Sequence, residues 1–268
     1  MEVKELSSWA EFENELNGLT RELALARFAS NASSFLFRGQ ADAGWSLDTT
    51  LDRRLREPVK YVQYMQWVSA AKPQIESLAN ERWNKLPSGI ELLEMGTNYD
   101  KLRFNILPTY EYLIYLRHHG FPSPLLDWTR SPYIAAFFAF RAIEANEVAI
   151  YCYQEMQGGG KTSSSAEPQI FKFGPYVTGH PRHHTQQSEY TCCMHFDDGH
   201  WYFVPHENVF SQESTTQDVL RKYVLPAELR DEVLKRLDAH NLNAFSLFGT
   251  NEALLEAIAL REIEFSSD

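Results

Sequence analysis

Cysteine is scarce in this sequence: there are three in 268 residues, and two of them, Cys192 and Cys193, are adjacent. An odd number with an adjacent pair is a poor disulfide framework, so we expect free thiols and a reducing compartment. No stretch approaches the roughly 20 apolar residues that a membrane helix needs. The first residues, MEVKELSSWAEFENEL, lack the basic and apolar regions of a signal peptide. These absences predict a soluble, cytoplasmic protein.

Basic residues are outnumbered, with 25 Lys and Arg against 36 Asp and Glu and a net charge of −11. This balance argues against a general nucleic-acid binder, whose affinity comes from basic groups that replace counterions on phosphates. The charge balance is still compatible with an enzyme that binds a nucleic acid briefly through a local basic patch. Hydrophobic residues make up 44% of the chain and aromatic residues 13%, so we expect a globular domain with a substantial core.

Several motifs of catalysis and metal binding are also missing. There is no GxSxG nucleophile elbow, and the nine histidines show neither HExxH nor paired CxxC spacing, so we expect polar surface histidines and no metal. The run Gly158-Gly-Gly-Lys161-Thr162 is no P-loop, because Glu155 stands where that motif needs its first glycine. The cysteines lie in apolar, strand-like segments and are expected in the core.

Periodicity predicts one α+β domain over 1–268, with an N-terminal helical part over 1–30 and a core over 31–260. Ser8 and Glu11 have the spacing of a capping box, so a helix is expected from Trp9 to about Phe28. Further helices are predicted over 57–83, 107–119, the segment after Pro132 and the last fifty residues. Strands are predicted at 35–39, 125–128, 147–153, 170–173, 189–196 and 200–204.

The segment FLFRGQ ends an aromatic strand with Arg38 and Gly39. Arg38 could pair with an acidic residue at the end of a sheet. It could equally bind phosphate, because a guanidinium suits bidentate phosphate contacts and glycine lets a ligand approach the backbone.

Two further segments carry polar residues next to predicted strands. Asp127, Thr129 and Ser131 lie between a strand and an apolar helix, where Thr129 or Ser131 can cap the helix and its start can attract an anion. Gln187 and Glu189 are two apart at the start of a strand, so their side chains are expected to project together into one pocket or along a solvated edge.

Together these segments resemble the FRG domain, a family named for a Phe-Arg-Gly motif, here Phe37-Arg38-Gly39. The run Gly120–Ala139, with its core LLDWTRSP, is similar to the second family signature. Arg182–Thr191 is similar to the third, with Ser188 in place of a glycine, and Leu247-Phe248 echoes a C-terminal segment. The resemblance covers roughly residues 30 to 260.

The order of these motifs also resembles that of the ADP-ribosyltransferases, with Arg38 first, Thr129 and Ser131 second, and Gln187-Ser188-Glu189 third. The second motif departs from their Ser-Thr-Ser, which leaves the role of Asp127 open. This resemblance implies an antiparallel or mixed split β-sheet flanked by N-terminal and C-terminal helices. It also implies an enzyme that uses NAD+ as a substrate.

Cleavage of the bond between nicotinamide and ribose passes through an oxocarbenium-like transition state, which a carboxylate can stabilise. By the resemblance, Glu189 is the catalytic carboxylate and Gln187 faces the nucleophile. The expected NAD+-binding residues are Arg38, which holds the pyrophosphate, with Gly39, Asp127, Trp128, Thr129, Ser131 and Tyr133.

A Gln-x-Glu motif implies an acceptor other than arginine, either a nucleobase of RNA or DNA or a protein side chain. Tyr176 and Arg182 are expected to bind it. The resemblance further implies a toxin-like effector of bacterial phage defence or of a toxin–antitoxin system, with an antitoxin protein as a partner. The alternatives are an NAD+ glycohydrolase and a non-enzymatic FRG module that binds a nucleotide or a protein.

Overall fold

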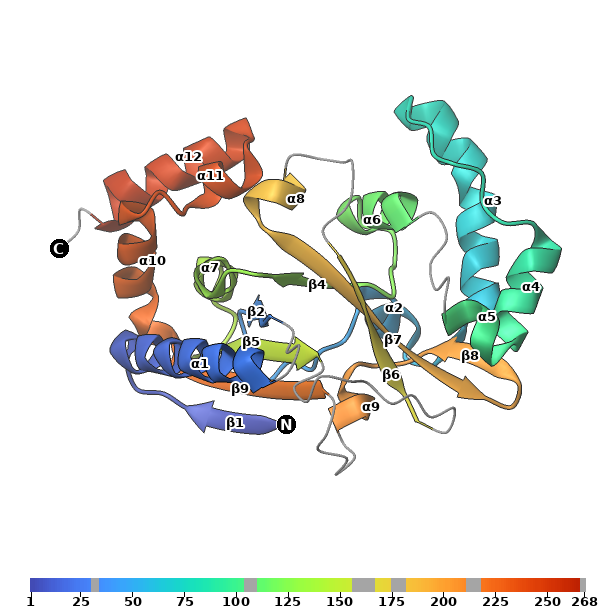
Figure 1. Cartoon of the computed structure of the whole chain (residues 1–268). Coiled ribbons are helices and arrows are strands. Elements are labelled where there is room, and N and C mark those ends of the chain that lie inside the picture. The colour runs from blue at the N-terminus through green and yellow to red at the C-terminus, as the bar shows by residue number, and fades with distance from the viewer. Residues whose placement is uncertain (30–33, 104–109, 156–166, 175–181, 211–217, 266–268) are drawn as a thin grey trace.

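A nine-stranded mixed β-sheet organises the computed structural model, which describes residues 1–29, 34–103, 110–155, 167–174, 182–210 and 218–265 (Figure 1). The strands are β1 (Glu2–Glu5), β2 (Leu36–Gln40), β3 (Val59–Lys60), β4 (Leu126–Thr129), β5 (Glu147–Glu155), β6 (Gln169–Phe173), β7 (Ser188–Asp197), β8 (His200–Phe203) and β9 (Asp218–Pro226). Their order is β1-β9-β5-β2-β4-β7-β8-β3, with β6 paired to β7 outside this path. Among these strands β1 pairs parallel to β9 and the other pairs are antiparallel.

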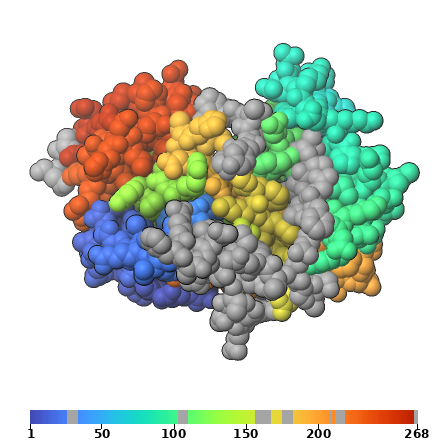
Figure 2. All heavy atoms as spheres, in the orientation of Figure 1, coloured from blue at the N-terminus to red at the C-terminus, as the bar shows by residue number. Residues whose placement is uncertain are grey.

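Two groups of helices cover the two halves of the sheet. The α-helices are α1 (Trp9–Ala29), α2 (Thr50–Leu55), α3 (Tyr61–Ala79), α4 (Gly89–Thr97), α5 (Tyr99–Arg103), α6 (Tyr110–His118), α7 (Pro132–Arg141), α8 (Arg182–Thr185), α9 (Glu207–Phe210), α10 (Arg230–Ala239), α11 (Ala244–Phe248) and α12 (Asn251–Ala259). A short 3-10 helix, η1 (Ala227–Leu229), precedes α10, and a π-helical segment, η2 (Leu260–Glu264), follows α12. Figure 2 shows the C-terminal helices and the α3–α4 pair at opposite sides of the molecule. None of the helices described is long and apolar enough to cross a membrane.

Each half has its own apolar core. On one side α1, α7 and α10 pack on β5 and β9 through a cluster that includes Phe12, Phe140 and Leu234. On the other side α3, α4 and α6 pack on β7 and β8 through a cluster that includes Tyr64 and Trp201. The strands between these cores, β2 and β4, are therefore held from both sides, and the candidate site lies there.

Most of the predicted elements are confirmed near their predicted positions. Helix α1 begins at Trp9, where Ser8 Oγ accepts the Glu11 N–H at 3.3 Å. The reciprocal bond differs from the predicted capping box, because the Glu11 carboxylate accepts the Ser7 N–H at 2.7 Å. The helix predicted over 57–83 is shorter, since α3 ends at Ala79 in a left-handed cap at Asn80.

The prediction that the last fifty residues are wholly helical is wrong for the first eight of them. Residues 218–226 form β9, which pairs with β5 along nine positions and also receives β1. Leu220, Tyr223, Val224 and Leu225 are buried there. Pairing with a central strand about seventy residues earlier decides this segment, and no local signal reports it.

The expected α+β class with a mixed sheet is confirmed at that level. Strand β7 is the branch point: residues 188–191 pair with β4, and residues 194–197 pair with β8. Strand β6 overlaps both stretches in register, so it takes the other edge of β7.

Gly39 is needed for close packing of β2 on α7. A Cβ atom at this position would lie 1.9 Å from the Ala135 carbonyl oxygen and 2.6 Å from the Ala139 nitrogen, both of them backbone atoms of α7. We expected this glycine to admit a ligand to the backbone. It also lines the cavity described below, but the atoms that exclude a side chain belong to the helix.

Replacement of Gly39 by alanine is therefore expected to destabilise the fold strongly. Neither backbone can move without breaking its own hydrogen bonds, so the loss should reach or exceed the roughly 1–3 kcal/mol of ordinary overpacking. Urea unfolding monitored by circular dichroism measures it. Gly18→Ala is the matched control, because nothing lies within 4 Å of a Cβ there and alanine favours a helix. Equal stability of the two variants would contradict this account of Gly39.

Candidate functional site

A cavity of about 820 Å³ opens where β2, β4 and β7 meet the surrounding helices. Its volume lies within the roughly 300–1,000 Å³ typical of small-molecule and cofactor sites. Its aromatic lining consists of Phe37, Trp45, Trp128, Phe138, Tyr190 and Phe248. Its ionisable lining consists of Arg38, Asp48, Arg53, His118, Asp127 and Arg182. Aromatic walls combined with several guanidinium groups suit a ligand that carries both rings and negative charge.

The cavity lies where two neighbouring strands part. Strands β2 and β4 share one register pair, Phe37 with Thr129, whereas β4 and β7 share four. Beyond that pair the Asp127 carbonyl oxygen accepts its hydrogen bond from a side chain of β2, because Arg38 Nη1 donates to it at 2.9 Å. The guanidinium group of Arg38 is thereby fixed between the strands.

Arg38 is a partly buried cation with donors left over. Burial lowers its pKa to about 10, and the neighbouring Asp127 carboxylate opposes that effect, so the group stays charged at neutral pH. Its Nε is buried, and no acceptor from the described residues reaches it. Because an unsatisfied buried donor is costly, this arginine is suited to receive an anionic acceptor from a ligand.

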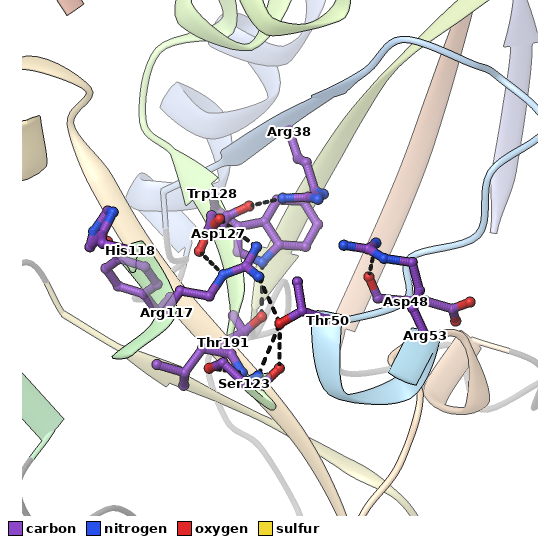
Figure 3. Close-up of polar contacts among 12 residues, drawn as sticks. Arg38, Asp48, Thr50, Arg53, Arg117, His118, Ser123, Asp127, Trp128 and Thr191 are labelled. Atoms are coloured by element: carbon purple, nitrogen blue, oxygen red, sulfur yellow. Dashed lines mark hydrogen bonds and ion pairs between the residues drawn. The ribbon is translucent and has the colours of Figure 1, made fainter. Parts of the chain in front are cut away.

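Asp127 is held by two parallel hydrogen bonds from one arginine (Figure 3). Arg117 Nε lies 2.9 Å from Asp127 Oδ1, and Arg117 Nη2 lies 2.6 Å from Oδ2. Burial acts to raise the pKa of Asp127, but the charge and hydrogen bonds of Arg117 outweigh it and lower the pKa below its ordinary value. The Asp127 side chain is nevertheless 41% exposed, because solvent reaches it through the cavity. The carboxylate is therefore ionised, fixed and accessible.

The same arginine ties three segments together. Arg117 Nη1 donates to Thr50 Oγ1 at 3.0 Å, and the Ser123 N–H donates to the same hydroxyl oxygen at 2.9 Å (Figure 3). Helix α6, helix α2 and the turn before β4 thus meet at Thr50. This network fixes the position of Asp127 relative to the helix that carries Arg53.

Trp128 is oriented by a buried chain of hydrogen bonds. Its Nε1 donates to Thr191 Oγ1 at 2.8 Å, and that hydroxyl lies 2.8 Å from His206 Nε2. Because an indole N–H can only donate, the Thr191 hydroxyl accepts from Trp128, and its role toward His206 is set by the tautomer of the imidazole. Burial lowers the pKa of His206 to about 3, which agrees with a neutral ring.

His118 and Tyr190 form a second polar pair on the cavity wall. His118 Nε2 lies 2.8 Å from the Tyr190 hydroxyl, and the ring of His183 stacks on Tyr190 at 5.7 Å between centroids. Burial raises the pKa of Tyr190, so its hydroxyl stays protonated. Sequence reasoning missed both residues. The signal for Tyr190 was its alternation with Ser188, which also lines the cavity, on one strand.

The structure gathers six of the predicted site residues around the cavity: Arg38, Gly39, Asp127, Trp128, Thr129 and Arg182. Ser131 instead caps α7, where its Oγ accepts the Ile134 N–H at 3.3 Å, as the capping alternative predicted. Tyr133 is 40% exposed and its ring lies 6.2 Å from that of Trp9, away from the cavity lining. Tyr176 and the run 158–162 lie outside the described residues.

Gln187 and Glu189 are not among the residues that line this cavity, although the neighbouring Gln186 and Ser188 are, and their shared site with Arg38 stays a prediction. Gln187 precedes β7 with φ +48°, and the strand alternation starts after it. Glu189 alternates with Ser188 and Tyr190 along β7, so its side chain lies on the face of the sheet shared by its register partner Trp128 and, one strand further, by Arg38. There its carboxylate is buried, 3.0 Å from Lys172 Nζ and 3.7 Å from Arg130 Nε.

Over the described ranges, no three His, Cys, Asp or Glu residues are placed to hold a metal ion. The three cysteines are free and buried. The groups able to act on a ligand in this cavity are thus the arginines, Asp127, and the His118–Tyr190 pair.

A comparison with protein-family models matches residues 33–147 to the FRG domain. The matched segment contains Phe37-Arg38-Gly39 and the LLDWTRSP run, and it ends before β7. Searches of curated proteins and of solved structures gave no match.

Loss of Arg117 is expected to leave the Asp127 carboxylate without its counter-ion. Arg117→Met should cost about 2–3 kcal/mol, somewhat less than the roughly 3–5 kcal/mol of a fully buried pair, because water reaches Asp127. The double variant Arg117→Met/Asp127→Leu should recover part of that loss. Urea unfolding at neutral pH measures both variants. A double variant as unstable as the sum of the two single variants would contradict the pairing.

The contribution of Asp127 to stability is expected to depend on pH. Its pKa is lower in the folded chain than the roughly 3.9 of an unfolded one. Its contribution is therefore complete above pH ~4 and is lost as the pH falls through the folded pKa. The stability difference between wild type and Asp127→Asn, measured by urea unfolding between pH 7 and 3, should shrink toward the acid end. A difference that grows on acidification would oppose this assignment.

Proposed function

We propose that this chain, whose residues 33–147 match the FRG domain, binds NAD+ in the Arg38 cavity and transfers its ADP-ribose unit to an acceptor other than arginine. The observation that carries the proposal is the pairing, in one cavity, of a fixed cation and a fixed anion. The distal donors of Arg38 face the cavity beside the ionised carboxylate of Asp127. NAD+ offers groups for both, because its pyrophosphate is anionic and its ribose hydroxyls donate hydrogen bonds.

Arg38 supports the pyrophosphate contact. One of its five N–H donors is used on the Asp127 carbonyl, and its Nε finds no acceptor among the described residues. Hydrogen bonds from a guanidinium to phosphate are charge-assisted and about twice as strong as neutral ones. An anionic ligand would also offset the cost of holding this cation in a partly buried position.

Asp127 takes the role that the motif order gave to Glu189. Arg117 occupies two of the roughly four lone-pair sites of the carboxylate, which leaves two for the hydroxyls of the nicotinamide ribose. In the transfer, the bond between C1′ of the ribose and the nicotinamide nitrogen breaks, and nicotinamide leaves with the electron pair. The acceptor then bonds to C1′ and gives up its proton. A fixed carboxylate beside the ribose stabilises the positive charge that develops on it.

The acceptor is proposed to enter beside Arg182. The Arg182 guanidinium lies 5.4 Å from the centre of the Phe248 ring, and both residues line the cavity. An aromatic ring beside a cation suits an unstacked nucleobase of RNA or DNA, and a protein side chain is the other acceptor class. The proposed setting is a toxin-like effector in phage defence or a toxin–antitoxin system, with an antitoxin protein as partner.

Labelled NAD+ incubated with the purified chain and with separate pools of cell protein, RNA and DNA tests the proposal. Wild type should move the label into one pool. Arg38→Gln and Asp127→Asn should reduce transfer by about 100-fold or more, the scale on which an electrostatic contact to a transition state acts. Glu189→Gln should retain activity, because Glu189 is not part of the cavity lining and its carboxylate is paired with Lys172 at 3.0 Å.

The other outcomes are equally informative. Free ADP-ribose as the product would establish a glycohydrolase, with water as acceptor in the same cavity. The absence of both NAD+ consumption and labelling would contradict the enzymatic activity and favour a binding module. Loss of activity in Glu189→Gln with normal activity in Asp127→Asn would restore Glu189 as the catalytic carboxylate.

A further inference from the structure

The loop after β2 and helix α2 place an exposed indole and a free guanidinium at the cavity. Trp45 is 48% exposed and Arg53 is exposed, and both line the cavity together with Arg38. None of these residues was selected from the sequence motifs except Arg38. An exposed aromatic ring in the same cavity wall as two cations offers a ligand both a stacking surface and positive charge.

The loop that carries Trp45 is fixed to the sheet. Its backbone is bonded at the Trp45 carbonyl by the Tyr151 hydroxyl at 3.1 Å and at the Ser46 carbonyl by Gln40 Nε2 at 3.0 Å. The Leu47 N–H donates to Glu207 Oε1 at 3.0 Å. The indole is thus exposed although its backbone is anchored, and no described aromatic ring stacks on it. A fixed, uncovered aromatic face is a stacking platform.

Arg53 is likewise positioned without a carboxylate partner. Its Nη1 donates to the Asp48 carbonyl at 2.9 Å, while the nearby Asp52 carboxylate is occupied by Thr49 in the cap of α2. Among the described residues no carboxylate oxygen lies within 4.0 Å of Arg53 or of Arg38. The positive charge of Arg53 also acts to lower the pKa of Arg38, because the two cations repel each other across the cavity.

We infer that Trp45, Arg53 and Arg38 form the site for the ADP half of the ligand. The adenine stacks on Trp45, and the diphosphate lies between the guanidinium groups of Arg53 and Arg38. Two like charges held near one another repel, and an anion placed between them offsets that repulsion. A diphosphate carries enough negative charge to contact both guanidinium groups. In Figure 3, Arg38 lies above the network that fixes Asp127, and Arg53 lies to the right of it. This inference rests on the proposed function for the identity of the whole ligand, but its own content is the binding of an adenine nucleotide.

Titration calorimetry of the full chain with ADP and with adenosine tests the inference. Arg53→Gln should weaken ADP binding by about 10-fold or more, as expected for loss of a charged hydrogen bond, and should leave adenosine binding unchanged. Trp45→Ala should weaken both ligands by about 10-fold, the scale of one base stacked on an aromatic ring. Arg54→Gln is the matched control, because Arg54 lies on the same helix outside the cavity lining, and it should alter neither.

Normal adenosine binding by Arg53→Gln shows at once that the variant is folded. The inference is overturned if wild type binds no ADP, or if Arg53→Gln binds ADP as tightly as wild type. If ADP binds in the expected pattern and NAD+ is not consumed, the nucleotide site stands and the transferase fails. If NAD+ is consumed and Arg53→Gln has the wild-type KM, the transferase stands and this site is overturned.

Discussion

The ion pair between Arg117 and Asp127 is the interaction on which the candidate site depends. It joins helix α6 to strand β4 at the point where β2 and β4 part, and through Thr50 it also fixes helix α2. A charged group that is partly removed from water needs a counter-ion, and Arg117 and Asp127 are counter-ions of each other. The same contact keeps Asp127 ionised while its carbonyl oxygen holds Arg38. One pair therefore positions the anion, the cation and the helix that carries Arg53.

The Phe-Arg-Gly motif divides its work among three neighbouring residues. Phe37 packs in the core beneath α7, Arg38 reaches the cavity, and Gly39 allows the backbone of α7 to approach β2. Alternation along the strand explains the division, because adjacent residues face opposite sides of the sheet. The motif thus contributes both to the packing of α7 and to the cavity wall. A substitution at Gly39 would act on the site through the packing of the helix.

Charge is distributed unevenly in this acidic chain. The net charge is −11, yet Arg38 and Arg53 face the cavity without a carboxylate partner among the described residues. A cavity with low-dielectric walls concentrates such a field and attracts an anion of modest size. A long polyanion would meet the acidic remainder of the surface. This contrast favours a nucleotide over an extended nucleic acid as the occupant of the cavity, and it leaves room for a short acceptor at Arg182.

The sequence by itself determined the local elements: the start of α1, strands β2, β4 and β5, and the helix after Pro132. It also singled out Arg38 and Asp127, which both line the cavity. Capping, turn residues and periodicity act between near neighbours, so they can be read along the chain. The tertiary structure alone decided that residues 218–226 form a strand, that Arg117 is the partner of Asp127, and that Tyr190 lines the cavity while the Glu189 carboxylate is buried beside Lys172. These outcomes depend on register between distant strands, where a shift of one residue exchanges the two faces.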